Sequence, residues 1–170
     1  MAHIQFSLDG PFEVHTTNGL VRRIKAEHVK RFWLNKDARQ CADMPGCYIF
    51  ALRYGHGHTP WYVGKTGRTL FAEIFTHHKL NIFNDVFDEG HRGTPVIFFV
   101  TRADGKNAIP ATKLGELEKF LIQTAKKKNR NLKNTVNTKN IEGWSIDGVY
   151  RSRRTAKSKI EDVFKKMMGL

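Results

Sequence analysis

The sequence predicts a mixed α/β fold, in which helices pack against a small three-stranded sheet. The runs 47–52 and 61–64 are rich in β-branched and aromatic residues. The segment 53–60 between them contains the glycines and proline typical of a turn, so the three together predict a β-hairpin. The apolar run 95–101 is continuous, as expected of a central strand that is buried on both faces.

Helical periodicity predicts how this sheet is covered. Apolar residues recur at helical spacing in 116–127, where Leu117, Phe120 and Leu121 share one face. A capping-box pattern, Ser158-x-x-Glu161, opens the last helix. In chain order, the other predicted elements are short strands around the turn 9–11 within 4–14, a helix at 26–34, a helix at 69–78, a loop at 105–110 and an edge strand at 144–150.

The length of 170 residues is that of a single domain with a core of its own. We expect a core at 45–135, an N-terminal β/α extension at 1–44 and a basic C-terminal strand–helix extension at 136–170. The two cysteines, Cys41 and Cys47, form neither a disulfide framework nor a zinc motif, which predicts a reducing cytoplasmic location.

The charge of the chain indicates its partners. Twenty-nine Lys and Arg residues against 16 Asp and Glu give a net charge of +13, which favours nucleic acid as the partner. No apolar stretch approaches the length of a membrane-spanning helix, so a membrane is not expected. Two basic clusters in the C-terminal third predict a surface that follows phosphates; their named members are Lys126, Lys127, Arg130, Lys133, Arg151, Arg153 and Arg154.

Two tyrosines stand beside glycines on the two strands of the predicted hairpin. They lie in Gly46-Cys47-Tyr48 and in Tyr62-Val63-Gly64, and a helix follows the second triplet. This ordered pair resembles the GIY-YIG nuclease family, and the matching elements cover about half of the chain, from Gly46 to Asn134. The resemblance implies an endonuclease that hydrolyses DNA phosphodiester bonds with Mg²⁺ or Mn²⁺, and RNA is not excluded as a substrate.

The resemblance also implies roles for individual residues. Tyr62 would be the catalytic base and Tyr48 its supporting partner. A tyrosine phenol ordinarily has a pKa near 10, so such a base needs nearby positive charge, which Lys65 is placed to provide. Glu118 would be the sole protein ligand of the metal ion. Helical geometry only half supports this choice, because Glu116 flanks the same apolar stripe on its other side.

Two further positions follow from the family pattern. Asn134 matches the asparagine after the glutamate-bearing helix, with Asn131 as a close competitor. His77 matches the histidine or tyrosine on the helix after the hairpin. That alignment puts Glu73 where the family carries an arginine, and a glutamate cannot stabilise a phosphate transition state. Arg68 or Lys79 would then supply the cation; a guanidinium holds two oxygens at once, which slightly favours Arg68 and leaves Lys79 as a phosphate contact.

Other patterns carry weaker interpretations. His56-x-His58 contains two residues that can bind a metal, but no third ligand lies nearby. The acidic residues Asp85, Asp88 and Glu89 are typical of a solvated surface. Trp61 is more typical of a buried hairpin than of a base-stacking platform. Two competing functions also stay open. One is a nucleic-acid-binding module without cleavage on the same fold; the other is a protein-interaction domain that docks through the methionine-bearing last helix.

Overall fold

A five-stranded sheet runs through the molecule in the order β3-β2-β4-β1-β5. The computed structural model describes residues 3–105, 108–134, 144–150 and 158–170. All neighbouring strands are antiparallel except β1 and β5, which are parallel. The strands are β1 (Ile4–Glu13), β2 (Gly46–Tyr54), β3 (Gly57–Thr66), β4 (Thr94–Arg102) and β5 (Trp144–Ile146).

The predicted mixed α/β class is confirmed, but the prediction of three strands is wrong. β1 pairs along the edge of β4 that the hairpin leaves free, with Phe6 opposite Arg102 and Leu8 opposite Val100. β1 is a single strand with an irregularity between Asp9 and Phe12, where short strands around a turn were expected. The segment 4–13 therefore extends the central sheet, because its apolar side chains complete both faces of the core.

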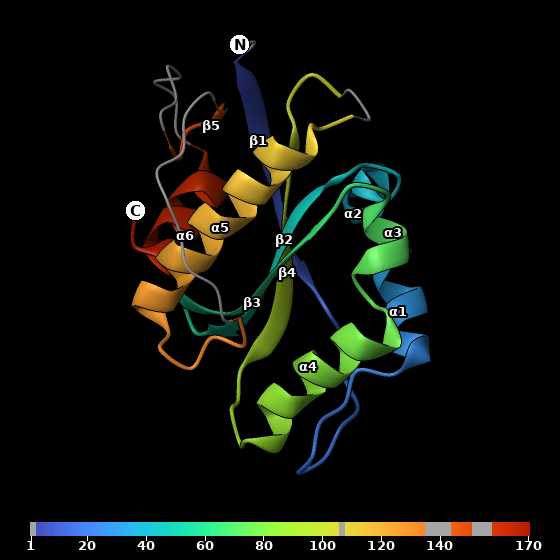
Figure 1. Cartoon of the computed structure of the whole chain (residues 1–170). Coiled ribbons are helices and arrows are strands. Elements are labelled where there is room, and N and C mark those ends of the chain that lie inside the picture. Colours follow the sequence, from blue (N-terminus) through green and yellow to red (C-terminus); the bar gives the residue numbers. More distant parts are fainter. Residues whose placement is uncertain (1–2, 106–107, 135–143, 151–157) are drawn as a thin grey trace.

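Helices cover both faces of the sheet. Figure 1 shows α5 and α6 on one side, and α1 to α4 on the other. Each side has its own apolar core: Ile49, Val63 and Phe98 belong to the α5/α6 side, whereas Phe50, Leu70 and Phe83 belong to the α1–α4 side. The helices are α1 (Ala26–Phe32), α2 (Lys36–Cys41), α3 (Leu70–Glu73), α4 (His77–Asp88), α5 (Ala111–Lys128) and α6 (Lys159–Met168).

The single helix predicted at 69–78 is two helices. α3 ends at Glu73, and α4 begins again after Thr76, whose hydroxyl accepts a hydrogen bond from the Lys79 backbone N–H at 3.4 Å. A threonine N-cap of this kind restarts a helix because it satisfies an N–H of the first turn. Asp85 and Asp88 accordingly lie within α4.

The C-terminal helix agrees with its sequence pattern. The Ser158–Glu161 capping box is formed, and Gly169 ends α6 in the left-handed conformation with φ 72°. Within the described ranges, no helix has both the length and the apolar character that crossing a membrane would require.

Candidate active site

Tyr48 and Tyr62 lie on the same face of the hairpin, the face covered by α3 and α4. In the antiparallel register Tyr48 is opposite Gly64, and Tyr62 is opposite Phe50, so all four positions share one side of the β2–β3 pair. The two phenol rings are 6.1 Å apart between centroids. The structure thus brings together the two tyrosines of the motif.

Gly64 is required by the packing of Tyr48. A Cβ atom at position 64 would lie 2.3 Å from Cζ of Tyr48 and 2.4 Å from its hydroxyl oxygen. The Tyr48 ring therefore rests directly on the backbone of β3, which only a residue without a side chain allows. This contact explains physically why a tyrosine on one strand accompanies a glycine on the other.

Tyr62 is held by a cation from α4. Nζ of Lys79 donates a hydrogen bond of 2.7 Å to the Tyr62 hydroxyl and lies 5.0 Å from the centroid of its ring. The same ammonium lies 3.6 Å from a carboxylate oxygen of Glu73, and the Lys79 side chain is only 16% exposed. Glu73 therefore does not replace the missing arginine; it pairs with the lysine that approaches Tyr62.

Tyr48 is a different kind of tyrosine from Tyr62. Its side chain is fully buried, and its hydroxyl has no hydrogen-bond partner among the described residues. Burial raises the pKa of the Tyr48 phenol well above its ordinary value, and negative charge on Tyr62 and on Glu73 acts in the same direction. Tyr48 therefore stays neutral at any physiological pH, which suits a packing partner rather than a base.

Glu118 and Lys65 form a second polar pair on the other face of the sheet. Nζ of Lys65 is 2.6 Å from Oε2 of Glu118, where α5 crosses β3. Lys65 is opposite Cys47, and both belong to the face covered by α5. The structure therefore separates Lys65 and Glu118 from the face that carries Tyr48 and Tyr62.

The pairing of Glu118 with Lys65 concerns the expected metal site, in which Glu118 is the protein ligand. Among the residues that the structure describes, no three His, Cys, Asp or Glu side chains gather where they could hold a metal ion. Glu118 already pairs with an ammonium group, which repels a divalent cation, and it faces away from the tyrosines. Glu118 is thus engaged by Lys65 on the face opposite Tyr62, and binding of Mg²⁺ or Mn²⁺ stays a prediction.

Asn134 forms hydrogen bonds with the backbone of β3 along its free edge. Its amide oxygen accepts a 2.8 Å hydrogen bond from the Val63 backbone N–H, and its amide nitrogen donates a 2.7 Å bond to the Val63 carbonyl. Nearby, Asn129 donates to the carbonyl of Pro60 at 2.8 Å. The expected phosphate contact at Asn134 therefore competes with a strand-like role in which one side chain replaces a missing β-partner.

The other expected catalytic residues lie outside this cluster. Arg68 is exposed, and its side chain forms no hydrogen bond or ion pair with the described residues. His77 is exposed at the start of α4, with Nδ1 3.4 Å from the Asn81 amide nitrogen. Of the two cation candidates, Lys79 and not Arg68 contacts a motif tyrosine.

The expected phosphate-binding surface is partly described. Lys126, Lys127 and Arg130 are exposed around the end of α5, whereas Lys133 makes a very short contact with the Glu89 carboxylate. Arg151, Arg153 and Arg154 lie outside the described residues, so a continuous basic face stays a prediction.

Two weaker candidates have structural surroundings of their own. His58 packs edge-on against Phe98, with ring centroids 5.8 Å apart, and burial, followed by Arg53, lowers its pKa. Trp61 is buried and packs on His91, with ring centroids 4.1 Å apart. Trp61 therefore has the buried position that its hairpin context predicts.

Comparison with protein-family models, with curated proteins and with solved structures finds no match for this chain. The likeness to the GIY-YIG family therefore depends on the motif residues themselves.

Proposed function

We propose that this protein is a nucleic-acid phosphodiesterase of the GIY-YIG type whose reactive group is the Tyr62 hydroxyl. The single observation that supports the proposal most is the 2.7 Å hydrogen bond between Lys79 and Tyr62, with Tyr48 packed on Gly64 beside it. The net charge of +13 supports nucleic acid as the substrate class. We take DNA as the first substrate and RNA as the second.

The cluster has the groups that phosphodiester hydrolysis needs. In this proposal Tyr62 acts as the phenolate and accepts the proton of an attacking water, and the Lys79 ammonium, 2.7 Å from that oxygen, is its counter-ion. Lys79 can also bind an oxygen of the phosphate, where one well-placed cation or donor accounts for about 10²–10³ in rate. Glu73 keeps the lysine in position through its 3.6 Å ion pair.

A divalent ion has no assigned step in this proposal. Dependence on Mg²⁺ or Mn²⁺ stays a prediction from the family resemblance, with Glu118 as the ligand. For that role the Lys65–Glu118 pair would have to open, since the carboxylate and the ammonium are 2.6 Å apart.

A second function, nucleic-acid binding without cleavage, is favoured by the pairing of the two lysines. Glu73 partly neutralises Lys79, and Glu118 partly neutralises Lys65, so both lysines already have an anionic partner. In a binding module such pairs would simply hold the side chains in place around a phosphate.

One experiment separates the two functions. Supercoiled plasmid is incubated with the purified protein in Mg²⁺, in Mn²⁺ and in EDTA, and binding of a labelled duplex is measured in parallel at several salt concentrations. Nicked or linear plasmid supports the phosphodiesterase. Salt-dependent binding without any cleavage supports the binding module, and an absence of both contradicts the two proposals together.

A further inference from the structure

A pocket of about 600 Å³ lies at the far end of α4 from Lys79. Three segments form it: the loop before α1 around Gly19, the hairpin turn at Gly55 and the α4–β4 connection around Gly93. All three glycines have positive φ, of 115°, 52° and 124°, so the backbone turns sharply at each. The volume suits a ligand of nucleotide size.

The pocket is basic. Its basic lining consists of Arg22, Arg53, Arg92 and His91, Tyr54 is the other titratable residue there, and no carboxylate lines it. Arg53 pairs with Glu13 at 2.9 Å, but Arg92 is exposed, and its side chain forms no hydrogen bond or ion pair with the described residues. The pocket therefore retains positive charge that internal ion pairs do not cancel.

Arg22 has one guanidinium nitrogen in a hydrogen bond and one without a partner among the described residues. Its Nη1 donates a 2.7 Å hydrogen bond to the Gly93 carbonyl, and its guanidinium carbon lies 4.8 Å from the ring centroid of Phe87. Its Nη2 is covered and has no hydrogen-bond partner among the described residues. An unsatisfied guanidinium nitrogen is costly, and an anionic oxygen would satisfy it after a small side-chain rotation.

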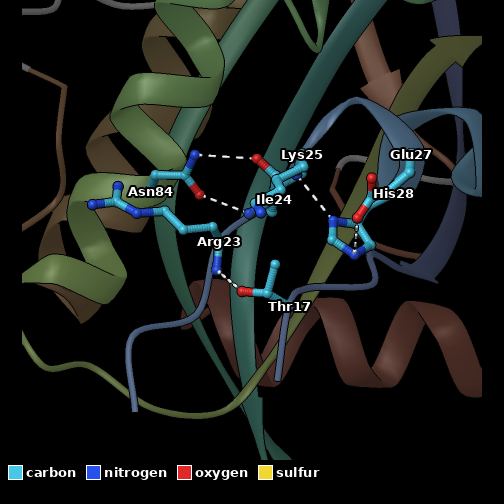
Figure 2. Close-up of polar contacts among 7 residues, drawn as sticks. All are labelled: Thr17, Arg23, Ile24, Lys25, Glu27, His28 and Asn84. Carbon is cyan, nitrogen blue, oxygen red and sulfur yellow. Dashed lines mark hydrogen bonds and ion pairs between the residues drawn. The ribbon is translucent and has the colours of Figure 1, made fainter. Parts of the chain in front are cut away.

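The loop that carries Arg22 is fastened to α4. Figure 2 shows that the Asn84 side chain bonds both backbone groups of Ile24, accepting from its N–H at 2.8 Å and donating to its carbonyl at 3.3 Å. The Arg23 N–H donates to the Thr17 hydroxyl at 2.9 Å, and the Arg23 guanidinium pairs with Asp88 at 2.8 Å. The backbone of the loop around Arg22 is thus set before any ligand arrives, which lowers the cost of binding.

We propose that this arginine pocket, formed by Arg22, Arg53 and Arg92, binds a phosphate group. Guanidinium groups match phosphate oxygens in geometry and charge. Lys79 and Asp88, the last residue of α4, are nine residues or about 14 Å apart along the helix axis, and the pocket residues follow directly, so the separation is roughly half a turn of duplex DNA. The pocket would then hold a backbone phosphate of the nucleic acid, about half a turn from the bond cleaved at Tyr62. That the phosphate belongs to a nucleic acid depends on the proposed function, whereas the binding of a phosphate group does not.

Amide NMR spectra of the labelled protein test the pocket in EDTA, without any cleavage step. The signals of Gly19, Gly55, Gly90 and Gly93 are followed as three probes are added: sodium phosphate, adenosine monophosphate and a 12-base-pair duplex with 5′-hydroxyl ends. Sodium chloride at equal ionic strength is the control. We expect saturable shifts of these glycine signals with the duplex, and none with chloride.

Matched variants connect the shifts to the arginines. Arg92→Gln removes an exposed charge that forms no hydrogen bond or ion pair with the described residues, so the variant should fold normally and weaken duplex binding at the pocket by on the order of tenfold. Arg22→Gln should have at least the same effect. Arg31→Gln removes an exposed arginine on α1, outside the pocket, and should leave the affinity within about twofold.

The outcomes show which kind of molecule carries the bound phosphate group. Saturation with inorganic phosphate or the mononucleotide but not with the duplex would overturn the nucleic-acid source and assign the pocket to a small phosphate ligand. No saturable shift with any probe, or equal losses in Arg92→Gln and Arg31→Gln, would overturn the phosphate pocket itself. A protein that binds phosphate here but never cleaves DNA would refute the phosphodiesterase and leave this pocket standing.

Discussion

Lys79 and Tyr62, 17 residues apart in the sequence, meet through a 2.7 Å hydrogen bond between an ammonium and a phenol. The restart of the helix at Thr76 brings Lys79 into the first turn of α4, next to the edge strand β3. Glu73, the last residue of α3, lies 3.6 Å from the same ammonium. The break between two helices thus places a cation on the motif tyrosine, at the site where an arginine was expected.

Removing the ammonium should therefore stop catalysis. We expect Lys79→Ala to lower the rate of plasmid cleavage by about 10²–10³, and Lys79→Arg to recover part of it, because the positive charge is restored. Lys65→Ala removes the lysine on the other face and is the matched comparison. Equal losses in the two alanine variants would mean that contact with Tyr62 gives Lys79 no special role.

Gly64→Ala should destabilise the fold. The new methyl group would meet the Tyr48 ring at 2.3 Å, so the ring must move, and overpacking of this kind costs about 1–3 kcal/mol. Urea unfolding followed by circular dichroism measures the change. Gly67→Ala is the control, because its methyl group meets no atom within 4 Å. A Gly64→Ala protein as stable as the control would contradict the close packing.

Tyr48→Phe should make the protein more tolerant of alkali. Burial raises the pKa of the folded Tyr48 phenol above the unfolded value of 10.0, so above pH 10 the unfolded chain ionises while the native state stays protonated. The wild type should then lose about 1.4 kcal/mol more per pH unit than the variant. Stability measured at pH 9, 10 and 11 tests this, and parallel curves for both proteins would rule it out.

The same variant should be stable at neutral pH. The Tyr48 hydroxyl is buried without a hydrogen-bond partner among the described residues, so its removal should be neutral or stabilise the fold by about 1 kcal/mol. Burial also raises the pKa of Cys47, and that of Cys41 to about 12. Both thiols are present in both proteins, so their alkaline effects cancel in the comparison.

Asn134→Ala should loosen the edge of β3. It removes both amide bonds to Val63, so we expect a loss of about 1–3 kcal/mol and faster hydrogen exchange of the Val63 amide. Asn131→Ala, at an exposed side chain, should change neither quantity. The comparison also decides between the two asparagines, since a larger effect at Asn131 would reverse their assignment.

The parts of the fold that could be predicted are those encoded locally. The hairpin, the strand β4 and the capped helix α6 follow from β-branched runs, turn residues and the Ser158–Glu161 pair. The break at Thr76 could not be separated from a continuous helix, because apolar residues on either side keep a helical period. Its signal was the threonine itself, a good N-cap residue. The pairing of β1 with β4 joins segments almost ninety residues apart, which no local pattern encodes.

In the candidate site, too, only the locally encoded features could be predicted from the sequence. The tyrosine–glycine triplets indicate two strands of one hairpin, and the structure places both phenols on one face. Strand alternation, however, puts Lys65 on the opposite face from Gly64, where it meets Glu118. The arginine pocket was missed altogether, because Arg22 and Arg92 come from two loops and Arg53 from the end of β2, far apart in the sequence and without a motif.

The most direct test of the account is the single-turnover rate of plasmid cleavage by Tyr62→Phe beside the wild type, with duplex binding measured for both. The variant removes one oxygen atom, so the fold and the binding should persist. We predict cleavage by the wild type, a loss of at least about 10² in the variant and unchanged affinity. Equal cleavage rates in the two proteins would contradict a reactive role for Tyr62, and a wild type that binds DNA but never cuts it would establish the binding module instead.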